Sequence, residues 1–492
     1  MEKHYLAVDL GAESGRVMLG SLSGGKLEVE EIHRFPNHPV HIQGTFRWDL
    51  LALYAGVKAG LKKAAERGVP ISGISTDAWG VDYVLLTSRE PMVSQAFHYR
   101  DARLDGATEK VFAQVSADRI FAETGIQFMQ INTLYQLWTD AKARPEVLEW
   151  SERFLMIGDW FNYLLSGRLT GEASLASTSQ LYNPVKGDWA WDLIGALKLP
   201  AKLFPPLVKP GTRLGPLVRE LELETNLKKA EVIASCSHDT AAAVAAVPGQ
   251  GEDWAFLSSG TWSLLGTELS APIINADSRK YNFTNEAGYQ GTILFRKNIV
   301  GLWIVQECKR AWEAMGTAYG YDELTAMAEA AEPLRSLIRP EDARFGKPGR
   351  MPAKIDDYCR ETGQPVPNSP GAYIRCILES LGLLYARTLD ECAAATGRSF
   401  RVLHVVGGGS RNRLLNQLTA DAVGLPVLAG PVEATAIGNL LIQAKTLGDE
   451  PGDIRSVVRR SFPVETFRPG ESGPWRGAAK RFEGLPVGRN PG

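Results

Sequence analysis

A short buried-strand pattern that runs into a glycine-containing turn occurs twice in this chain, once at the start and once just past the middle. At the start, apolar and alternating segments predict strands over residues 5–9, 16–22 and 26–35. Asp49 is a suitable cap for the amphipathic helix that follows, and an apolar segment over 71–76 predicts the next strand. The predicted order in this half is three strands, a helix and a fourth strand.

The same order of elements begins again in the second half of the chain. Residues 254–257 and 261–269 are predicted strands on either side of a Ser-Ser-Gly turn. A long amphipathic helix is predicted over 370–395, and a strand over 402–406 leads into three consecutive glycines. Two halves with one order of elements predict a duplicated α/β architecture.

The length of 492 residues is enough for two or three domains with sizeable cores. We place the boundary between the halves at residues 243–252, where Pro248 and Gly249 end an alanine-rich stretch. The predicted domains are an N-terminal one over residues 1–245 and a C-terminal one over residues 246–492.

Charge balance and apolar patterning limit the classes of partner. Lys and Arg number 54 against 56 Asp and Glu, so the net charge of −2 leaves no basic excess for a nucleic acid or an anionic membrane. No apolar run is long enough to predict a membrane span, and the N-terminus lacks the apolar run of a signal peptide. We therefore expect a cytoplasmic protein, in which the thiols are reduced; a disulfide between Cys359 and Cys376 is the alternative. We expect the protein to be a monomer or a homodimer.

Three glycine-containing turns have the composition of phosphate-binding loops, in which backbone N–H groups converge on anionic oxygens. The first covers residues 9–16 and combines Asp9, two glycines and Arg16. The second is Ser-Ser-Gly-Thr at 258–261, and the third is the triple glycine at 407–409. Each alone is more typical of a tight turn, but their recurrence at matching places in the two halves indicates a kinase or an ATPase.

Two other patterns do not predict a site. Residues 20–26 match the spacing of a P-loop, but Leu27 follows where a Mg²⁺-binding hydroxyl is required, so we expect a hairpin turn there. His33, His38 and His41 lie in a proline-containing loop without the spacing of metal ligands, and no structural zinc is predicted.

Ten collinear segments, spread over nearly the whole chain, are similar to one known family. They are AVDLGAESGR (7–16), DAWGVDY (77–83), HYRDAR (98–103), GIQFMQINTLYQL (125–137), SHDTAAA (237–243), LSSGTWSLLG (257–266), TNEAG (284–288), KNIVGLW (297–303), VVGGGSRNRLLNQL (405–418) and GPVEATAIGN (430–439). In these segments the chain resembles the FGGY family of carbohydrate kinases, whose fold is like those of actin, Hsp70 and hexokinase. The resemblance implies two ribonuclease H-like α/β domains around a central cleft.

The resemblance also implies an activity. The segments DAWGVDY, SHDT and KNIVGLW are most similar to the branch of the family that phosphorylates L-rhamnulose. ATP, with Mg²⁺, is then expected to phosphorylate the 1-hydroxyl of this sugar in L-rhamnose breakdown, which yields L-rhamnulose 1-phosphate and ADP. Two alternatives stay open: a kinase for another ketose or polyol such as fuculose, xylulose or glycerol, and, from another class of protein, an actin-like ATPase.

The same resemblance implies residues of the site. Asp239 is expected to be the catalytic base, and Asp9 is expected to orient a hydrated Mg²⁺. The expected sugar-binding residues are Gly80, His238, Asp239, Thr240 and Asn298. The expected nucleotide-binding residues are Ala12, Glu13, Ser14, Gly15 and Arg16 in the first hairpin, with Thr261, Gln306 and Gly408 in the second half.

Asp239, Asp77 and Asp82 also have interpretations that rest on the residues alone. Asp239 precedes an alanine-rich helix and could cap it, or it could be a base; the resemblance favours the base. Asp77 and Asp82 flank Trp79 and Gly80 after a predicted strand, where they could either form a turn or recognise sugar hydroxyls. We favour Asp82 for sugar binding, whereas Trp79 fits the core and the site equally well.

Overall fold

The computed structural model describes residues 2–450 and 452–488, which form two compact units. Both units are discontinuous in sequence. The first comprises the chain up to Pro248, residues 268–295 and residues 434–462, and the second comprises residues 249–267, residues 296–433 and the chain from Pro463 onward.

A mixed sheet of six strands forms the centre of the first unit, in the order β13-β14-β6-β1-β2-β3. The strands are β1 (Lys3–Leu10), β2 (Ser14–Ser23), β3 (Lys26–Pro36), β6 (Ile71–Ala78), β13 (Thr212–Pro216) and β14 (Glu231–Ala234). β1, β2 and β3 pair in antiparallel fashion, whereas β6 is parallel to both β1 and β14. Because parallel strands end at one edge of the sheet, the loops after β1, β6 and β14 meet there.

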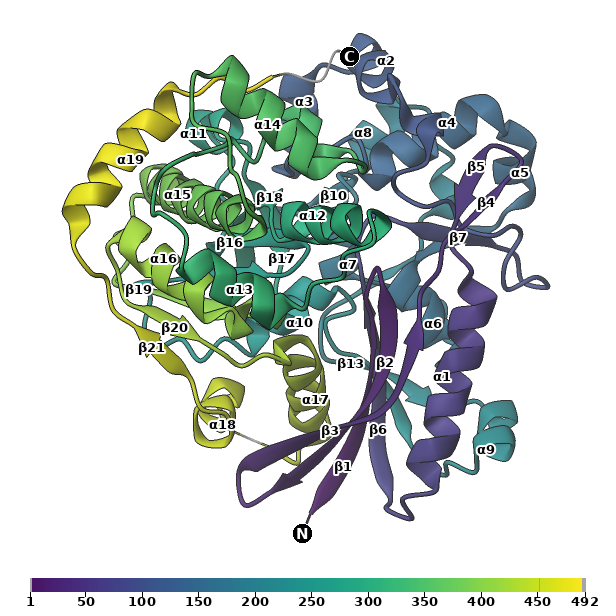
Figure 1. Ribbon diagram of the computed structural model, residues 1–492. Coiled ribbons are helices and arrows are strands. Elements are labelled where there is room, and N and C mark those ends of the chain that lie inside the picture. The colour runs from purple at the N-terminus through teal and green to yellow at the C-terminus, as the bar shows by residue number, and fades with distance from the viewer. Residues whose placement is uncertain (1, 451, 489–492) are drawn as a thin grey trace. The chain divides into compact units, whose positions relative to one another are not determined.

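Helices cover both faces of this sheet (Figure 1). On one face, α1 (Leu50–Ala65) and α6 (Ile157–Ser166) share a hydrophobic core with Leu6 and Ile74. On the other face lie α10 (Asp239–Ala245) and α17 (Ala434–Leu447), and the two helices approach closely. A Cβ atom on Gly438 would lie 1.8 Å from the carbonyl oxygen of Ala242, so only glycine allows this packing.

The strands of the second unit follow the corresponding order, β18-β16-β15-β19-β20-β21. They are β15 (Trp254–Ser259), β16 (Trp262–Leu269), β18 (Ile293–Val300), β19 (Val402–Val406), β20 (Val427–Ala429) and β21 (Glu465–Phe467). β15 is antiparallel to β16 and parallel to β19, β19 is parallel to β20, and β21 closes the edge in antiparallel fashion. Central parallel strands with antiparallel neighbours therefore occur in both units.

The remaining strands and helices complete each unit. In the first unit they are β4 (Val40–Ile42), β5 (Thr45–Arg47), β7 (Tyr83–Leu86), β8 (Arg153–Met156), β9 (Gly171–Glu172), β10 (Tyr182–Asn183), β11 (Asp188–Trp189), β12 (Leu207–Val208), β17 (Thr284–Ala287), α2 (Ala107–Gln114), α3 (Ala117–Thr124), α4 (Thr133–Ala143), α5 (Pro145–Trp150), α7 (Ala173–Thr178), α8 (Trp191–Ala196), α9 (Arg219–Thr225), α11 (Ala276–Lys280) and α18 (Ile454–Ser461). In the second they are α12 (Trp303–Ala314), α13 (Tyr321–Glu329), α14 (Met351–Glu361), α15 (Pro370–Thr396), α16 (Arg413–Val423) and α19 (Ser472–Gly484).

The elements predicted from the sequence are confirmed in both halves. Asp49 caps α1, and its carboxylate accepts a hydrogen bond of 3.1 Å from the backbone N–H of Ala52. The long predicted helix is α15, which continues to Thr396 and ends at Gly397 with a left-handed backbone. Residues 20–26 do form a hairpin between β2 and β3, as expected once the P-loop was rejected.

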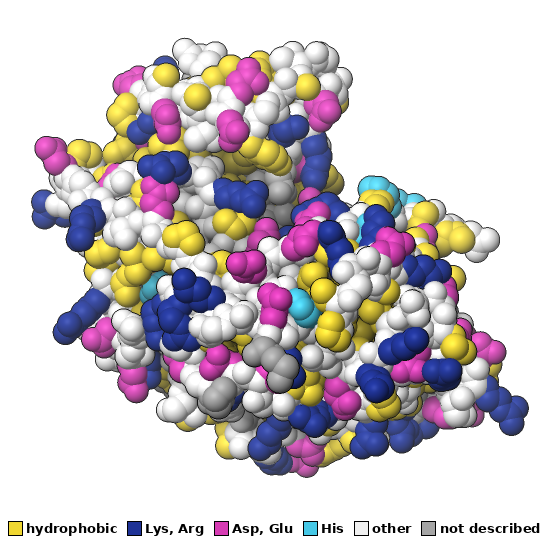
Figure 2. Space-filling view, turned by 90° about the horizontal axis from the view of Figure 1, so that it is seen from below, with side chains coloured by type: hydrophobic (Ala, Val, Ile, Leu, Met, Phe, Trp, Pro, Cys, Tyr) yellow, Lys and Arg dark blue, Asp and Glu magenta, His cyan; other side chains and the backbone are white. Residues whose placement is uncertain are grey.

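The distribution of charged side chains, the helices and the cysteines can be compared with what the composition predicted. Figure 2 shows basic and acidic side chains interspersed over the face that it draws. No helix within residues 2–450 and 452–488 has both the length and the apolar character needed to cross a bilayer. All five cysteines are free and buried, so Cys359 and Cys376 do not form a disulfide.

Candidate active site

Two carboxylates end neighbouring parallel strands of the first unit. Asp9 on β1 and Asp77 on β6 are partners in the strand register. Asp9 forms an ion pair with Arg16, its antiparallel register partner on β2. Asp77 is fully buried, and its Oδ2 accepts a hydrogen bond from the Asn439 side chain of α17. The edge where β1 and β6 end is therefore acidic.

Asp239 lies at the same edge of the sheet. The backbone N–H of Ala78, at the end of β6, donates a hydrogen bond of 2.9 Å to the carbonyl oxygen of Ser237, and Ala78 forms a parallel bridge with His238. Asp239 is the first residue of α10, and its Oδ1 accepts hydrogen bonds from the backbone N–H and the hydroxyl of Thr240 at 2.5 and 3.1 Å. Its side chain is 31% exposed, so a ligand can reach it.

The charges at this edge influence one another. Desolvation raises the pKa of Asp239; nearby His238 lowers it, and the negative charge of Asp9 raises it. Burial holds the pKa of Asp77 well above its usual value, and the charges of Asp9 and Asp239 raise it further. The neighbouring carboxylate charges thus disfavour ionisation of Asp77 and of Asp239.

A buried glutamate holds the turn that carries Asp239. The Glu172 carboxylate accepts hydrogen bonds from the backbone N–H groups of Ser237 and Ser174 at 2.9 and 2.8 Å. The Ser174 hydroxyl in turn accepts a bond of 3.1 Å from the backbone N–H of His238. Burial raises the pKa of Glu172 to about 6. These bonds fix the backbone before α10 without using the Asp239 side chain.

His238 stands between two carboxylates. Its Nε2 is 3.4 Å from Oδ1 of Asp239, and its Nδ1 is 3.3 Å from Oε2 of Glu286. Glu286 is on β17, in the segment 268–295 that joins the first unit. Sequence reasoning gave Glu286 no role. The only signal was its place in the segment TNEAG, which contributed to the family resemblance.

Gly80 and Asp82 follow β6, as expected, but Asp82 is fully buried. Its Oδ2 accepts hydrogen bonds from Nε1 of Trp48 and Nε1 of Trp79 at 2.6 and 3.0 Å, and its Oδ1 accepts one of 2.8 Å from Nε2 of Gln136. Burial raises the pKa of Asp82 to about 6. The carboxylate therefore fixes two indole rings. Neither Trp48 nor Gln136 was predicted, because both come from distant segments.

Gly80 faces a close neighbour. A Cβ atom at this position would lie 2.8 Å from Oγ1 of Thr178, the last residue of α7. The Thr178 hydroxyl also accepts a hydrogen bond of 3.1 Å from the backbone N–H of Val81. A side chain at position 80 would therefore displace this part of α7.

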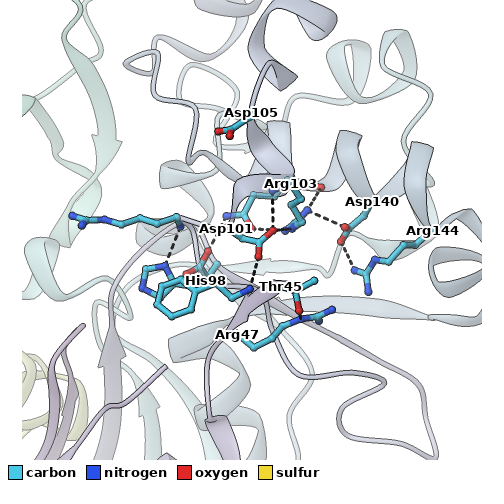
Figure 3. Close-up of polar contacts among 12 residues, drawn as sticks. Thr45, Arg47, His98, Asp101, Arg103, Asp105, Asp140 and Arg144 are labelled. Atoms are coloured by element: carbon cyan, nitrogen blue, oxygen red, sulfur yellow. Dashed lines mark hydrogen bonds and ion pairs between the residues drawn. The ribbon is translucent and has the colours of Figure 1, made fainter. Parts of the chain in front are cut away.

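An arginine-rich network contacts Gln136, and Figure 3 shows its members Arg103, Asp140 and Arg144. Arg103 donates hydrogen bonds to the side chain of Gln136 and to Oδ1 of Asp140, both at 2.9 Å. Asp140 also pairs with Arg144 at 2.8 Å. The Arg103 and Arg144 guanidinium groups lie 3.9 and 4.5 Å from the ring centre of Phe97. Arg103 belongs to the segment HYRDAR. This segment therefore contacts Gln136, whose side-chain amide donates a hydrogen bond to Asp82.

The first hairpin lies between β1 and β2, where it was expected. Ala12 and Glu13 are exposed at its tip, and Gly11 N–H closes it with a bond of 3.0 Å to the carbonyl oxygen of Ser14. A Cβ atom on Gly15 would lie 2.3 Å from the ring of Phe35. Gly15 is thus required by packing, whatever ligand the exposed tip binds.

The second unit brings its three predicted nucleotide residues together at the end of β15. The Gln306 side chain of α12 donates a hydrogen bond of 3.1 Å to the hydroxyl of Thr261. The triple glycine lies beside the same turn, because a Cβ atom on Gly409 would lie 2.0 Å from Oγ of Ser259. Gly408 itself is exposed, and a Cβ atom on it would meet no described atom within 4 Å, so a flat ligand can approach its backbone.

Asn298 is the predicted sugar residue that belongs to the second unit. It is half-buried on β18, and its Oδ1 accepts a hydrogen bond of 2.7 Å from Arg296.

Comparison with solved structures identifies the fold. The fold matches a gluconate kinase from Lactobacillus acidophilus with a TM-score of 0.79 at 15% identity, over 99% of this chain and 96% of that one. It matches a Plasmodium falciparum glycerol kinase with a TM-score of 0.78 at 12% identity, over 98% of this chain and 97% of that one. The architecture is thus the two-domain α/β fold of carbohydrate kinases.

Sequence comparison identifies the family. Residues 4–246 match the N-terminal domain, and residues 255–447 the C-terminal domain, of the FGGY family of carbohydrate kinases. A Rhamnulokinase of Bacteroides thetaiotaomicron is 44% identical over 98% of this chain and 99% of its own length. Those of Enterococcus faecalis and Bacillus subtilis are 42% and 40% identical, over 95% and 94% of this chain and 94% and 95% of their own lengths. The chain belongs to the FGGY family and is a carbohydrate kinase.

Proposed function

We propose that this protein transfers the γ-phosphoryl group of ATP to the 1-hydroxyl of L-rhamnulose. The observation that carries this proposal is the position of Asp239, a partly exposed carboxylate beside Asp9 at the edge where the parallel strands of the first unit end. Curated relatives that match nearly the whole chain bear the name Rhamnulokinase, which supports L-rhamnulose as the acceptor.

Asp239 is proposed to act as the base. Phosphoryl transfer proceeds through a loose transition state, so orientation of the attacking hydroxyl contributes more than proton removal. The sugar oxygen forms a bond to the γ-phosphorus while the bond between that phosphorus and the β,γ-bridging oxygen breaks, and ADP leaves. The hydroxyl proton passes to the Asp239 carboxylate, whose raised pKa makes it a better acceptor than an exposed aspartate.

The residues present fit a hydrated Mg²⁺ bound together with ATP. Mg²⁺ prefers oxygen ligands, keeps several waters and is commonly held by one or two carboxylates and substrate phosphates. Asp9 and Asp239 supply two such carboxylates, and within residues 2–450 and 452–488 no cluster of three or more metal-binding side chains forms a closed cage. We propose that Asp9 orients the ion through water. When bound, Mg²⁺ would neutralise charge on the phosphate oxygens.

The other proposed contacts divide between sugar and nucleotide. Gly80, His238 and Thr240 of the first unit are proposed to contact the sugar, and Asn298 of the second unit is proposed as a further sugar contact. Asp82 stays among the proposed sugar residues, and its burial favours an indirect contribution through the Trp79 ring next to Gly80. The proposed nucleotide contacts are Ala12, Glu13, Ser14, Gly15, Arg16, Thr261, Gln306 and Gly408.

A panel of acceptors tests the proposed substrate. ADP release is measured with L-rhamnulose, L-fuculose, D-xylulose and glycerol at equal concentrations, and the phosphorylated position is assigned by NMR. The proposal requires L-rhamnulose to have the highest kcat/KM and the product to carry its phosphate on C1. A higher value for another acceptor would transfer the proposal to that sugar, and ATP turnover that does not depend on sugar would favour the actin-like alternative.

We propose a cytoplasmic location, where ATP is available.

Asn298→Ala is expected to raise the KM for L-rhamnulose by roughly 3- to 10-fold, because one hydrogen bond to a neutral sugar oxygen contributes about 0.5–1.5 kcal/mol. The KM for ATP should stay within about twofold, which steady-state kinetics with each substrate varied in turn would measure. Asn368→Ala, which replaces an exposed asparagine of the same unit, serves as the matched control. A larger change in the KM for ATP than for the sugar would move Asn298 to the nucleotide site.

A further inference from the structure

The short turn that leads into Asp239 is held by buried side chains. The backbone N–H of Ser237 donates a hydrogen bond of 2.9 Å to the carboxylate of Glu172. The next N–H, that of His238, donates one of 3.1 Å to the hydroxyl of Ser174. Ser237, Glu172 and Ser174 are fully buried, so water does not compete for these two bonds.

Glu172 organises both of these bonds. It is the last residue of β9 and caps α7, where its Oε1 accepts a hydrogen bond of 2.8 Å from the backbone N–H of Ser174. Its Oε2 accepts the N–H of Ser237 and the hydroxyl of Ser174. Because that hydroxyl donates its hydrogen to Glu172, its lone pairs are left to accept the N–H of His238. Glu172 thus acts on two consecutive N–H groups, directly and through Ser174.

Helix α6 packs against the same turn and fixes the backbone of Glu172. The side-chain amide of Asn162 donates a hydrogen bond of 3.3 Å to the Ser237 hydroxyl, and a Cβ atom on Gly158 would lie 2.7 Å from the carbonyl oxygen of Ser237. Asp159 accepts the backbone N–H of Glu172 at 3.1 Å. The Glu172 carboxylate is therefore an acceptor in a fixed place.

The direction of the Asp239 carboxylate depends on this backbone. Its Oδ1 accepts hydrogen bonds from the N–H and the hydroxyl of Thr240, and the ring of His238 lies 3.4 Å from the same oxygen. These contacts are with residues adjacent in the sequence, so they move together with the turn. A misplacement of about 1 Å can cost about 10²-fold in rate, so a small shift of the turn matters for catalysis.

We propose that Glu172 is a positioning residue for Asp239. Its carboxylate holds the backbone of Ser237 and His238 in one position and thereby directs the Asp239 carboxylate toward the acceptor hydroxyl. The catalytic part of this proposal rests on the function proposed above, whereas the hold on the turn does not.

Glu172→Gln keeps the size of the side chain but replaces one accepting oxygen with an NH₂ group. Because Oε1 and Oε2 each accept a backbone N–H, either orientation of the amide leaves Ser174 or Ser237 facing a donor. We expect kcat to fall by about 10-fold or more, since the base is displaced. The KM for ATP should change less than about twofold. Steady-state kinetics with each substrate varied in turn measure both constants.

Combination with Asp239→Asn separates positioning from a general loss of structure. If Glu172 acts through Asp239, then Glu172→Gln should lower the single-turnover rate of the Asp239→Asn protein by less than about twofold, because residues that act as a unit are not additive. An equal loss in both backgrounds would overturn the proposal. A rate like that of the wild type for Asp239→Asn alone would instead refute the base of the proposed function, so the two failures are distinguishable.

Amide hydrogen exchange tests the hold on the turn without any activity. A peptide that contains residues 235–239 should exchange about 10-fold faster in Glu172→Gln than in the wild type, because a buried N–H has lost its acceptor. Mass spectrometry after proteolysis of the exchanged protein measures this rate. Unchanged exchange in this peptide would overturn the proposal, even if the protein phosphorylated none of the sugars.

Ser174→Ala is a second variant, which carries the test if Glu172→Gln fails to fold. It removes the hydroxyl that accepts the N–H of His238, so kcat should fall by about 3- to 10-fold and the same peptide should exchange faster. Ser179→Ala is the matched control. Its hydroxyl is also fully buried and accepts a backbone N–H, that of Leu181, at 3.0 Å. An equal fall in kcat for both serine variants would overturn the proposal.

Glu152→Gln is the matched control for the carboxylate. Glu152 of the first unit accepts the N–H and the hydroxyl of Ser88, both at 3.0 Å, as Glu172 does with Ser174. We expect neither kcat nor the exchange of the peptide with residues 235–239 to change in this variant. A fall in kcat as large as that in Glu172→Gln would overturn the proposal.

Discussion

Asp239→Asn is expected to lower kcat by at least about 100-fold, because the amide cannot take up the hydroxyl proton and a positioned base contributes about 10²- to 10⁴-fold. Binding should survive, since asparagine has the same shape and its Oδ1 can still accept the hydrogen bonds from Thr240. Single-turnover kinetics measure the chemical step, and calorimetric titration measures the affinities for the sugar and for a non-hydrolysable ATP analogue.

The control for this variant is Asp49→Asn, which makes the same chemical change at the cap of α1. Asparagine caps a helix as well as aspartate does, so neither activity nor stability should change appreciably. A turnover within a few-fold of the wild type for Asp239→Asn would contradict the assignment of Asp239 as the base. A loss of sugar binding with normal chemistry in the bound state would make Asp239 a binding residue instead.

Arg103→Ala is expected to lower the free energy of unfolding of the first unit by about 3 kcal/mol, because removing one partner of a largely buried ion pair leaves a charge without compensation. The Arg103 side chain is 13% exposed and that of Asp140 2% exposed, so solvent cannot replace the lost guanidinium. The same substitution removes the hydrogen bond that holds the Gln136 side chain. Urea unfolding followed by tryptophan fluorescence reports the change, since Trp48 and Trp79 belong to this unit.

Arg100→Ala is the matched control for that experiment. Arg100 is an exposed arginine three residues earlier in the same segment, so its removal should change the unfolding free energy by no more than about 0.5 kcal/mol. Equal unfolding midpoints for Arg103→Ala and the wild type would show that the network in Figure 3 does not stabilise the unit. Because Gln136 also contacts Asp82, we further expect a raised KM for L-rhamnulose in Arg103→Ala.

Local patterns in the sequence were sufficient for part of the regular elements. Side-chain periodicity located β1, β2, β3 and β6 of the first central sheet and β15, β16 and β19 of the second, but not the other strands of these sheets. Asp49 marked the start of α1 through a hydrogen bond that spans only three residues. The glycine turns were recognisable for the same reason. Such features depend on residues within a few positions of one another, so the local composition and spacing are enough to predict them.

The partners of the acidic residues were not predictable in this way. Asn439 is 362 residues from Asp77, to which it donates a hydrogen bond, and Trp48 is 34 residues from Asp82. Asp82 was chosen as a sugar ligand because it follows a strand, but only its burial shows that both of its oxygens are already occupied by protein donors. Nothing near these residues in the sequence indicates such contacts.

The order of residues along the chain thus specified seven of the strands, the cap of α1, the glycine turns and, through family resemblance, the class of enzyme. Folding decided which segments share a unit, because residues 268–295 and 434–462 pack with the N-terminal part of the chain. It also decided which carboxylates are desolvated and which charges they face. The physical reason is that side-chain periodicity is a local property, whereas burial and electrostatic neighbours arise only when distant segments pack together.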